Sequence, residues 1–185
     1  MNNQSVEGYL KIILGPMFSG KTSYLINAYN DNISNNISTL AINHSLDNRY
    51  GTGEIVSHDN NSIPCIDMLK LSEIYNIDFI EYDSIIINEA QFFEDILLMV
   101  TVLVEKYNKN VIICGLDGDY RQQKFGSILD LIPISNEVTK LHGNCHFCKS
   151  KSYFTIRITK ETDQISIGND NYLPVCRKCY NLYSQ

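Results

Sequence analysis

Hydrophobic residues along this chain gather in four short runs, separated by longer stretches of mixed polarity. The runs occupy residues 10–14, 38–42, 84–88 and 110–115. They are rich in isoleucine and valine and do not alternate cleanly between apolar and polar positions, which is typical of strands covered on both faces. The pattern therefore predicts four buried strands of a parallel sheet.

Helix-like stretches lie between these runs. Residues 21–29 follow the first strand, residues 68–75 precede the third, and residues 92–108 join the third to the fourth. Strands that alternate with helices form parallel sheets with helices packed against them. We therefore expect an α/β domain over residues 1–141, with helices on both faces of its sheet.

The pattern changes near residue 144, where two C-x-x-C pairs begin. Cys145 and Cys148 form the first pair, and Cys176 and Cys179 form the second. The stretch between them is too short for a core of its own, so a metal ion would have to hold residues 142–185 in shape. Four thiolates suit a closed, structural Zn²⁺ site. Disulfides are the alternative, which a reducing compartment disfavours.

The two remaining cysteines, Cys65 and Cys114, lie in apolar runs and are expected to be small buried residues. The chain has 185 residues and a formal net charge of −6 at pH 7. That charge disfavours a nucleic-acid partner, because proteins that bind long nucleic acid usually present a basic surface. No apolar run approaches the roughly 20 residues of a membrane span, and no secretory signal is visible. We therefore expect an intracellular, cytoplasmic protein without a membrane partner.

The segment GPMFSGKT, residues 15–22, carries the first chemical signal. It fits the phosphate-loop pattern G-x-x-x-x-G-K-[ST], with a predicted strand before it and a predicted helix after it. Backbone N–H groups and the helix N-terminus of such a loop face the phosphates of a nucleoside triphosphate. Lys21 would reach the β- and γ-phosphates, and Thr22 would offer its hydroxyl to Mg²⁺. A chance glycine-rich turn is the alternative.

The third predicted strand ends on Asn88 and Glu89, where an acidic pair is the usual partner of a phosphate loop. Only Glu89 is charged. Ligands bind at the carboxyl ends of parallel strands, and a carboxylate there can accept a proton from an attacking hydroxyl or water. The alternative is that Glu89 merely caps the helix that starts near Phe92.

Two loops carry weaker signals. Tyr120 and Phe125 flank a polar, basic loop after the fourth strand, where they either line a ligand or belong to the core. Arg49 lies in a loop of polar and glycine residues, where it is either solvated or bound to phosphate.

Together these motifs resemble the type II thymidine kinases. The resemblance runs nearly end to end, through ILGPMFSGKT, DNRY, SHD, NEAQFF, LDGDYRQQKFG and the two C-x-x-C pairs. It implies an α/β fold with a P-loop (RecA-like) parallel-sheet core, followed by a small C-terminal domain in which Zn²⁺ holds a lasso over the thymidine site. It also implies transfer of the γ-phosphate of ATP to the 5′-hydroxyl of thymidine or deoxyuridine, with Mg²⁺.

Roles for individual residues follow from the same resemblance. Glu89 matches the general base, while Lys21 and Arg49 would neutralise charge on the transferred phosphoryl group. The ATP-binding positions are Gly15, Pro16, Met17, Phe18, Ser19, Gly20, Lys21, Thr22, Asp47, Asn48, Arg49, Asn88, Glu89, Ala90 and Gln91. The substrate-binding positions are Met17, Phe92, Leu116, Tyr120, Phe125, Thr155, Asp163, Gln164, Ile165, Ser166, Ile167 and Tyr172. The zinc ligands are Cys145, Cys148, Cys176 and Cys179, and Thr22 serves Mg²⁺.

Three departures from the family accompany these matches. Asn88 stands where most relatives have aspartate, Tyr120 stands where phenylalanine is common, and the lasso is one residue shorter than in some relatives. The resemblance further implies a homotetramer and inhibition by thymidine triphosphate (dTTP). A nucleic-acid-linked ATPase with a zinc ribbon and a non-catalytic nucleotide-binding module are the rival functions. The net charge disfavours the first, and the intact Lys21, Thr22 and Glu89 disfavour the second.

Overall fold

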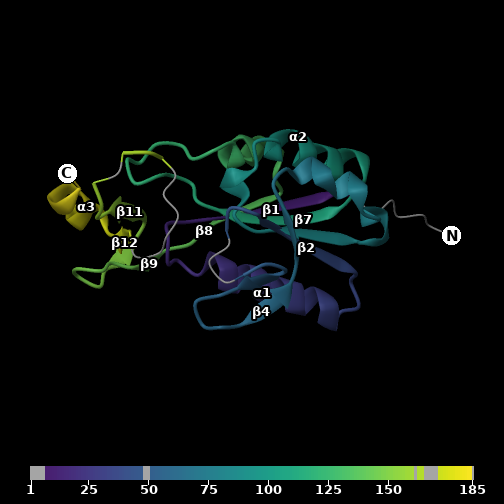
Figure 1. Ribbon diagram of the computed structural model, residues 1–185, viewed down its shortest axis with the longest axis horizontal. Coiled ribbons are helices and arrows are strands. Elements are labelled where there is room, and N and C mark those ends of the chain that lie inside the picture. The colour runs from purple at the N-terminus through teal and green to yellow at the C-terminus, as the bar shows by residue number, and fades with distance from the viewer. Residues whose placement is uncertain (1–6, 48–50, 161, 165–170, 185) are drawn as a thin grey trace.

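A six-stranded parallel sheet forms the centre of the computed structural model, which describes residues 7–47, 51–160, 162–164 and 171–184 (Figure 1). The strand order is β5–β2–β6–β7–β1–β8, and every neighbouring pair is parallel. The strands are β1 (Tyr9–Leu14), β2 (Thr39–His44), β5 (Ile66–Met68), β6 (Ser84–Ile87), β7 (Asn110–Gly115) and β8 (Glu137–Lys140). The four predicted strands are therefore confirmed. The two strands that the hydrophobic runs do not predict, β5 and β8, lie at the edges of the sheet.

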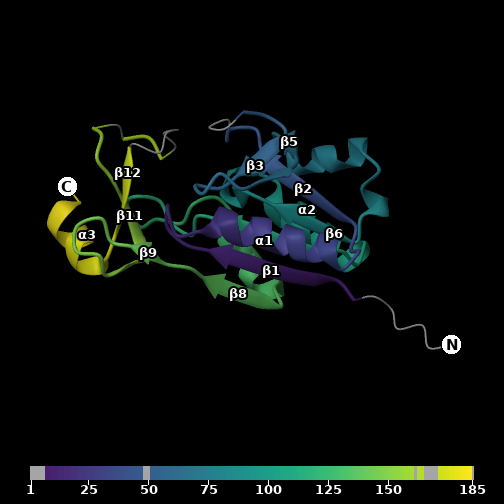
Figure 2. The same cartoon turned by 90° about the horizontal axis from the view of Figure 1, so that it is seen from below.

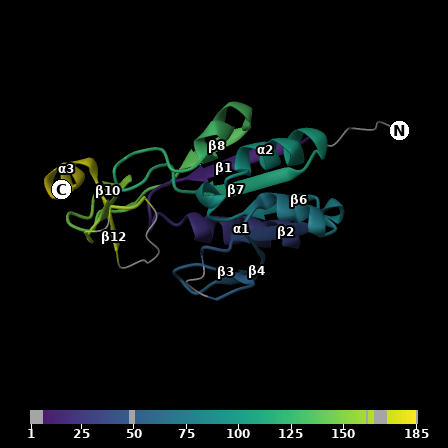
Figure 3. The same cartoon turned by 45° about the horizontal axis from the view of Figure 1, so that its top comes forward.

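One face of the sheet is covered by α1 (Lys21–Ser34), which extends five residues beyond the predicted residues 21–29. Its Leu25 and Ile26 are buried against the sheet residues Ile13 and Ile86. A hairpin of β3 (Glu54–Val56) and β4 (Ser62–Pro64) lies beside α1 and extends this layer (Figure 3).

The opposite face is covered by shorter helices, so the predicted two-sided covering is confirmed (Figure 1). They include α2 (Ile96–Thr101), which continues as a π-helix, η4 (Val102–Lys106). Short 3₁₀ helices complete the layer: η1 (Leu71–Asn76), η2 (Phe79–Glu81), η3 (Ala90–Phe92) and η5 (Ile128–Ile134). Within the described ranges, no helix has both the length and the apolar character needed to cross a bilayer.

Two predicted helices differ from the observed ones. The helix predicted over residues 68–75 is the 3₁₀ helix η1, and Met68 instead ends strand β5. The first N–H groups of η1 donate hydrogen bonds to the Asp95 carboxylate. The helix predicted over residues 92–108 begins at Ile96, and Asp95 is its N-cap residue. Its second half has π geometry where the Thr101 hydroxyl donates to the Leu97 carbonyl, a contact that competes with the α-helical backbone ladder.

The described residues between 143 and 184, which are 143–160, 162–164 and 171–184, form a small unit beyond the carboxyl ends of the sheet strands (Figures 1 and 2). It contains two short ladders and one helix: β9 (Gly143–Asn144) with β10 (Lys151–Ser152), β11 (Phe154–Arg157) with β12 (Tyr172–Val175), and α3 (Arg177–Tyr183). Its own core of buried residues comprises Cys145, Ile156, Val175 and Cys179. We call it the cysteine unit.

Candidate active site

The glycine-rich loop between β1 and α1 adopts a tight turn that depends on its glycines. A side chain at Gly15 would place a Cβ atom 2.7 Å from the Ser19 hydroxyl oxygen and 2.9 Å from the Leu141 carbonyl oxygen. Gly20 has φ 83°, in the left-handed region, and is the N-cap of α1. Since glycine has no side chain, it leaves the first N–H groups of α1 without a side-chain cap and directed toward the loop.

Lys21 folds back over this loop. Its side chain is 9% exposed, and its ammonium group donates to the Pro16 carbonyl at 2.7 Å. The Ser19 hydroxyl donates to the same carbonyl at 2.8 Å. A positive charge and the N-terminus of a fourteen-residue helix therefore meet at one small loop. This arrangement favours an anion such as a phosphate group.

Glu89 follows β6 at the same edge of the sheet, where its backbone is left-handed (φ 51°, ψ 40°). It occupies the N-cap position of η3, but its side chain makes no capping hydrogen bond. One carboxylate oxygen instead accepts a hydrogen bond of 2.6 Å from the Gln91 side-chain amide. The alternative that Glu89 only caps a helix therefore does not account for the hydrogen bond between its carboxylate and Gln91.

Gln91 fixes that carboxylate from a buried position. Its side chain is 3% exposed, and its carbonyl oxygen accepts a hydrogen bond of 2.9 Å from the Leu116 N–H. Side chains at Gly115 and Gly126 would collide with Gln91, so both glycines permit this close approach. The resemblance placed Gln91 among ATP-binding positions, and within the described residues its side chain also orients the Glu89 carboxylate.

Asn88 lies in a buried polar chain that joins the carboxyl ends of several strands. Its amide is 2% exposed and donates to the Asn43 side-chain oxygen at 2.9 Å. Its own oxygen accepts from the Cys114 thiol at 3.1 Å. Asn43 continues the chain to the Asp67 carboxylate and the Asp47 carbonyl, both at 3.3 Å. The sequence offered no signal for Asn43 or Asp67, because neither belongs to a recognised motif.

Cys114 is buried, as predicted, but it is also a hydrogen-bond donor. Burial raises the pKa of its thiol to about 12, so the group is neutral at physiological pH and retains the proton that it donates to Asn88. Cys65 is only half-buried, and burial raises the pKa of its thiol to about 12 as well.

Aromatic residues form a wall beside Glu89. Phe92 meets Phe125 edge to face, with ring centroids 5.5 Å apart, and lies 5.6 Å from His44. Phe125 is buried, while Leu116 and Tyr120 are half-buried. The two aromatic residues of the 116–125 loop therefore differ. Phe125 packs like a core residue, whereas Tyr120 stays accessible to a ligand.

The cysteine unit approaches the glycine-rich loop directly. The Met17 N–H donates to the Thr155 hydroxyl at 3.2 Å, which joins that loop to β11. Thr155 and Tyr172 are buried, Gln164 is half-buried and Asp163 is exposed. The structure thus brings candidate residues from both ends of the chain together. Asn48, Arg49, Ile165, Ser166 and Ile167 lie outside the described residues.

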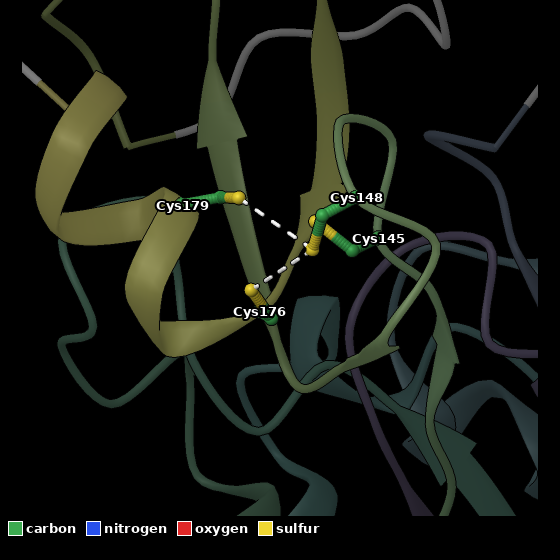
Figure 4. A group of neighbouring side chains, drawn as sticks. All are labelled: Cys145, Cys148, Cys176 and Cys179. Carbon is green, nitrogen blue, oxygen red and sulfur yellow. Dashed lines mark hydrogen bonds between the residues drawn. The ribbon is translucent and has the colours of Figure 1, made fainter.

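The four paired cysteines converge, as the C-x-x-C spacing predicts (Figure 4). Their sulfur atoms all lie within 4.8 Å of one another, with Cys148 3.6 Å from Cys176 and 3.8 Å from Cys179. A disulfide would require about 2.05 Å, so these are separate thiols. Tetrahedral Zn²⁺ with bonds of about 2.3 Å holds its sulfur ligands about 3.8 Å apart, and the cluster fits that geometry.

Local hydrogen bonds prepare part of this cluster for a cation. Burial alone would raise the pKa of Cys145, but the N–H groups of Cys176, Cys148 and Phe147 outweigh it and lower that pKa to about 6. The Ser150 hydroxyl and N–H lower the pKa of Cys148. Burial and the neighbouring thiols raise the pKa of Cys179 to about 12. A bound metal would therefore displace a proton from Cys179, which couples metal affinity to pH.

The fold and these sites define an α/β protein that carries a glycine-rich loop of the phosphate-binding pattern, a positioned glutamate and a four-cysteine cluster suited to zinc. The family model described as thymidine kinase matches residues 8–180. The chain belongs to the thymidine kinase family.

Relatives from distant sources share this similarity. The chain is 42% identical over 181 residues to the thymidine kinase of Yaba monkey tumor virus, covering 97% of both chains. It is 40% identical over 178 residues to thymidine kinase a of Arabidopsis thaliana, covering 94% of this chain and 75% of the relative. It is 38% identical over 174 residues to the thymidine kinase of vaccinia virus (strain Western Reserve), covering 94% and 97%.

Proposed function

We propose that this protein transfers the γ-phosphate of ATP to the 5′-hydroxyl of thymidine or deoxyuridine. The observation that carries the proposal is the Glu89 carboxylate, held by Gln91 at the same sheet edge as the glycine-rich loop. A base and a phosphate cradle at one edge suit a reaction in which a hydroxyl attacks a phosphoryl group. Family membership supports thymidine as the acceptor.

In this mechanism the residues of the loop bind and the glutamate moves a proton. The backbone N–H groups of residues 18–22 and the Lys21 ammonium group hold the triphosphate, and Lys21 exchanges its contact with the Pro16 carbonyl for phosphate oxygens. Glu89 accepts the proton of the 5′-hydroxyl as its oxygen attacks the γ-phosphorus and the bond to ADP breaks. Arg49 neutralises charge on the transferred group. Mg²⁺, held with Thr22, would neutralise the phosphates when bound.

The nucleoside would lie between the sheet edge and the cysteine unit. Phe92, Leu116 and Phe125 supply an apolar wall on the sheet side, and Thr155 and Tyr172 supply the facing side. We further propose that residues 142–185 act as a zinc-held lasso domain over residues 1–141, and that the protein works as a cytoplasmic homotetramer that dTTP inhibits. The convergent thiols support the zinc site, and the family resemblance supports the other points.

A screen of ATP consumption over the four deoxynucleosides and deoxyuridine, with single-stranded DNA as an additional arm, tests this function. We expect thymidine to stimulate ADP release together with thymidine monophosphate formation, whereas purine deoxynucleosides give no stimulation. Stimulation by DNA without any nucleoside monophosphate would replace the proposal with a nucleic-acid-linked ATPase. Nucleotide binding without any turnover would indicate a non-catalytic module.

A further inference from the structure

Tyr120 is held by the cysteine unit at three separate points. Its backbone carbonyl accepts a hydrogen bond of 2.9 Å from the Tyr180 hydroxyl. Its ring lies beneath the Arg157 guanidinium, 4.1 Å from the ring centroid. Its own hydroxyl donates to the Thr162 carbonyl at 2.9 Å. One residue of the loop that follows β7 therefore contacts helix α3, strand β11 and the segment after β11.

Asp119, the residue before Tyr120, also joins this loop to the cysteine unit. Asp119 is 6% exposed, and one of its carboxylate oxygens accepts the N–H groups of Arg121 and Gln123 at 2.9 and 2.8 Å. The other oxygen accepts from the Gln164 side-chain amide at 2.9 Å. Since the first oxygen fixes the shape of the loop and the second reaches Gln164, the loop and the segment over residues 162–164 are held together as one wall.

Tyr180 links this wall to the cysteines. It follows Cys179 in the chain, and its N–H donates to the Cys176 carbonyl at 2.8 Å. Two members of the four-cysteine cluster therefore set where the Tyr180 hydroxyl lies. Helix α3 also packs against β11 and β12, which carry Thr155 and Tyr172.

We propose that Tyr180 and Tyr120 are positioning residues, which transmit the shape of the cysteine unit to the wall of the nucleoside site. This inference rests on the proposed function for the identity of the nucleoside. Tyr180 fixes the 116–125 loop through the Tyr120 backbone, and the Tyr120 hydroxyl then fixes residues 162–164. A phenylalanine at position 120 would keep the ring beneath Arg157 but would offer no donor to the Thr162 carbonyl.

The proposal predicts a specific division of effects. The two hydroxyls act on the nucleoside wall and not on the glycine-rich loop, so their loss weakens thymidine binding and leaves ATP binding in place. A neutral hydrogen bond of this kind accounts for roughly two- to tenfold in an equilibrium constant. The two effects are also coupled, because the Tyr120 hydroxyl reaches Thr162 only while Tyr180 holds the loop.

The test uses the full chain as Tyr180→Phe, Tyr120→Phe and the double variant, with Tyr183→Phe as a matched control. Tyr183 lies on the same helix, but its exposed ring stacks on Phe147 at 4.1 Å, away from the loop. The zinc content of each protein is measured first, followed by thymidine and ATP affinity, kcat and KM. Hydrogen exchange of residues 157–164 is then measured without nucleoside.

We expect each single variant to retain its zinc, to bind thymidine about two- to tenfold more weakly and to bind ATP as before. The double variant should lose less affinity than the product of the two single losses, and exchange over residues 157–164 should quicken in all three. Unchanged exchange and affinity, strictly independent losses, or a parallel loss of ATP affinity would overturn the inference. If exchange quickens but the parent protein does not phosphorylate thymidine, the proposed function fails and the structural link stands.

Discussion

The described part of residues 1–141, which we call the sheet domain, meets the cysteine unit at one edge of the sheet. The two regions are stabilised in different ways. On one face of the sheet alone, twenty-two buried hydrophobic residues form a continuous core within the described chain. The corresponding core of the cysteine unit has four members, and two of them are cysteines. Burial of that few side chains does not offset the conformational entropy of an ordered segment. On this account the sheet domain holds its shape through its own core, whereas the cysteine unit would need a bound metal to hold its shape.

The proposed catalytic and binding roles are divided between the same two regions. The groups that would hold ATP and accept the proton belong to the sheet domain, where packing fixes them. Half of the nucleoside site belongs to the cysteine unit, and only a few contacts, such as that of Met17 with Thr155, join it to the glycine-rich loop. Catalysis and nucleoside recognition are thus assigned to regions that can be perturbed independently, and the predictions below use this property.

Replacement of Glu89 should have the largest effect. Glu89→Gln keeps the shape of the side chain and its contact with Gln91 but cannot accept the proton, so kcat should fall by roughly 10²–10⁴-fold. ATP affinity, thymidine affinity and zinc content should stay within about twofold, because the cysteine unit is untouched. Steady-state kinetics and metal analysis measure these quantities. Glu94→Gln, an exposed neighbour, serves as the control, and near-normal turnover of Glu89→Gln would remove Glu89 from the mechanism.

Loss of one thiolate should loosen the cysteine unit and leave the sheet domain unchanged. Cys176→Ser should release the zinc ion and accelerate hydrogen exchange in residues 143–157 and 172–184 by about tenfold or more, since metal binding and folding of so small a unit are coupled. Exchange in β1, β6 and β7 should not change. Cys65→Ser, outside the cluster, is the control. If freshly purified protein contains no zinc, or if the sheet loosens equally, the division into two regions is wrong.

Asp95 tests the sheet domain without touching the cysteine unit. Its carboxylate accepts the N–H groups of Leu71 and Ser72, both at 2.9 Å. Burial raises the pKa of Asp95, but these hydrogen bonds outweigh it and hold the pKa below its ordinary value of 3.8. Asp95→Asn should therefore lower the free energy of unfolding by about 1–3 kcal/mol at neutral pH, with unchanged zinc content.

The pH dependence of that difference follows from the lowered pKa. The Asp95 contribution is fully present above the unfolded pKa near 3.8 and is lost as the pH falls through the lower folded value. Denaturant unfolding of both proteins between pH 3 and pH 7 would show the gap closing in acid. A gap that widens toward low pH would contradict this account of Asp95.

The smallest expected effect concerns Asn88, the neutral residue before Glu89. Asn88→Asp should lower the Mg²⁺ concentration for half-maximal activity by a few-fold, because a carboxylate attracts a hard cation more strongly than an amide does. The added negative charge beside Glu89 should also move the acid limb of the pH–rate profile upward.

A magnesium titration of both proteins measures that effect, and Cys114→Ala, which removes a hydrogen bond to Asn88 without adding a charge, is the control. Identical midpoints would mean that position 88 does not act on the metal. Its role would then be limited to the buried chain through Asn43.

The predictable parts of this structure are those with local causes. Runs of isoleucine and valine identify β1, β2, β6 and β7, because burial on both faces leaves a continuous apolar signature. The C-x-x-C pairs identify the cysteine cluster, because ligand spacing within each pair is local. Strand β8 has the mixed sequence EVTK and lies at the sheet edge, where one exposed side removes that signature.

The parts that escape prediction depend on partners far apart in the chain. Asn43 meets Asn88 only because β2 and β6 are neighbours in the sheet. The Asp95 carboxylate accepts the first N–H groups of η1, more than twenty positions away. Tyr180 reaches Tyr120 across sixty residues. None of these polar contacts has a sequence pattern, since each one requires the register and packing of the finished fold.

The central claim is that the sheet domain binds ATP on its own while the cysteine unit completes the thymidine site. Calorimetric titration of both ligands into zinc-loaded and zinc-stripped protein tests it most directly. The account predicts that removal of zinc weakens thymidine binding by at least about tenfold and changes ATP affinity by less than about twofold. Equal loss of both affinities, or full thymidine affinity without zinc, would contradict it.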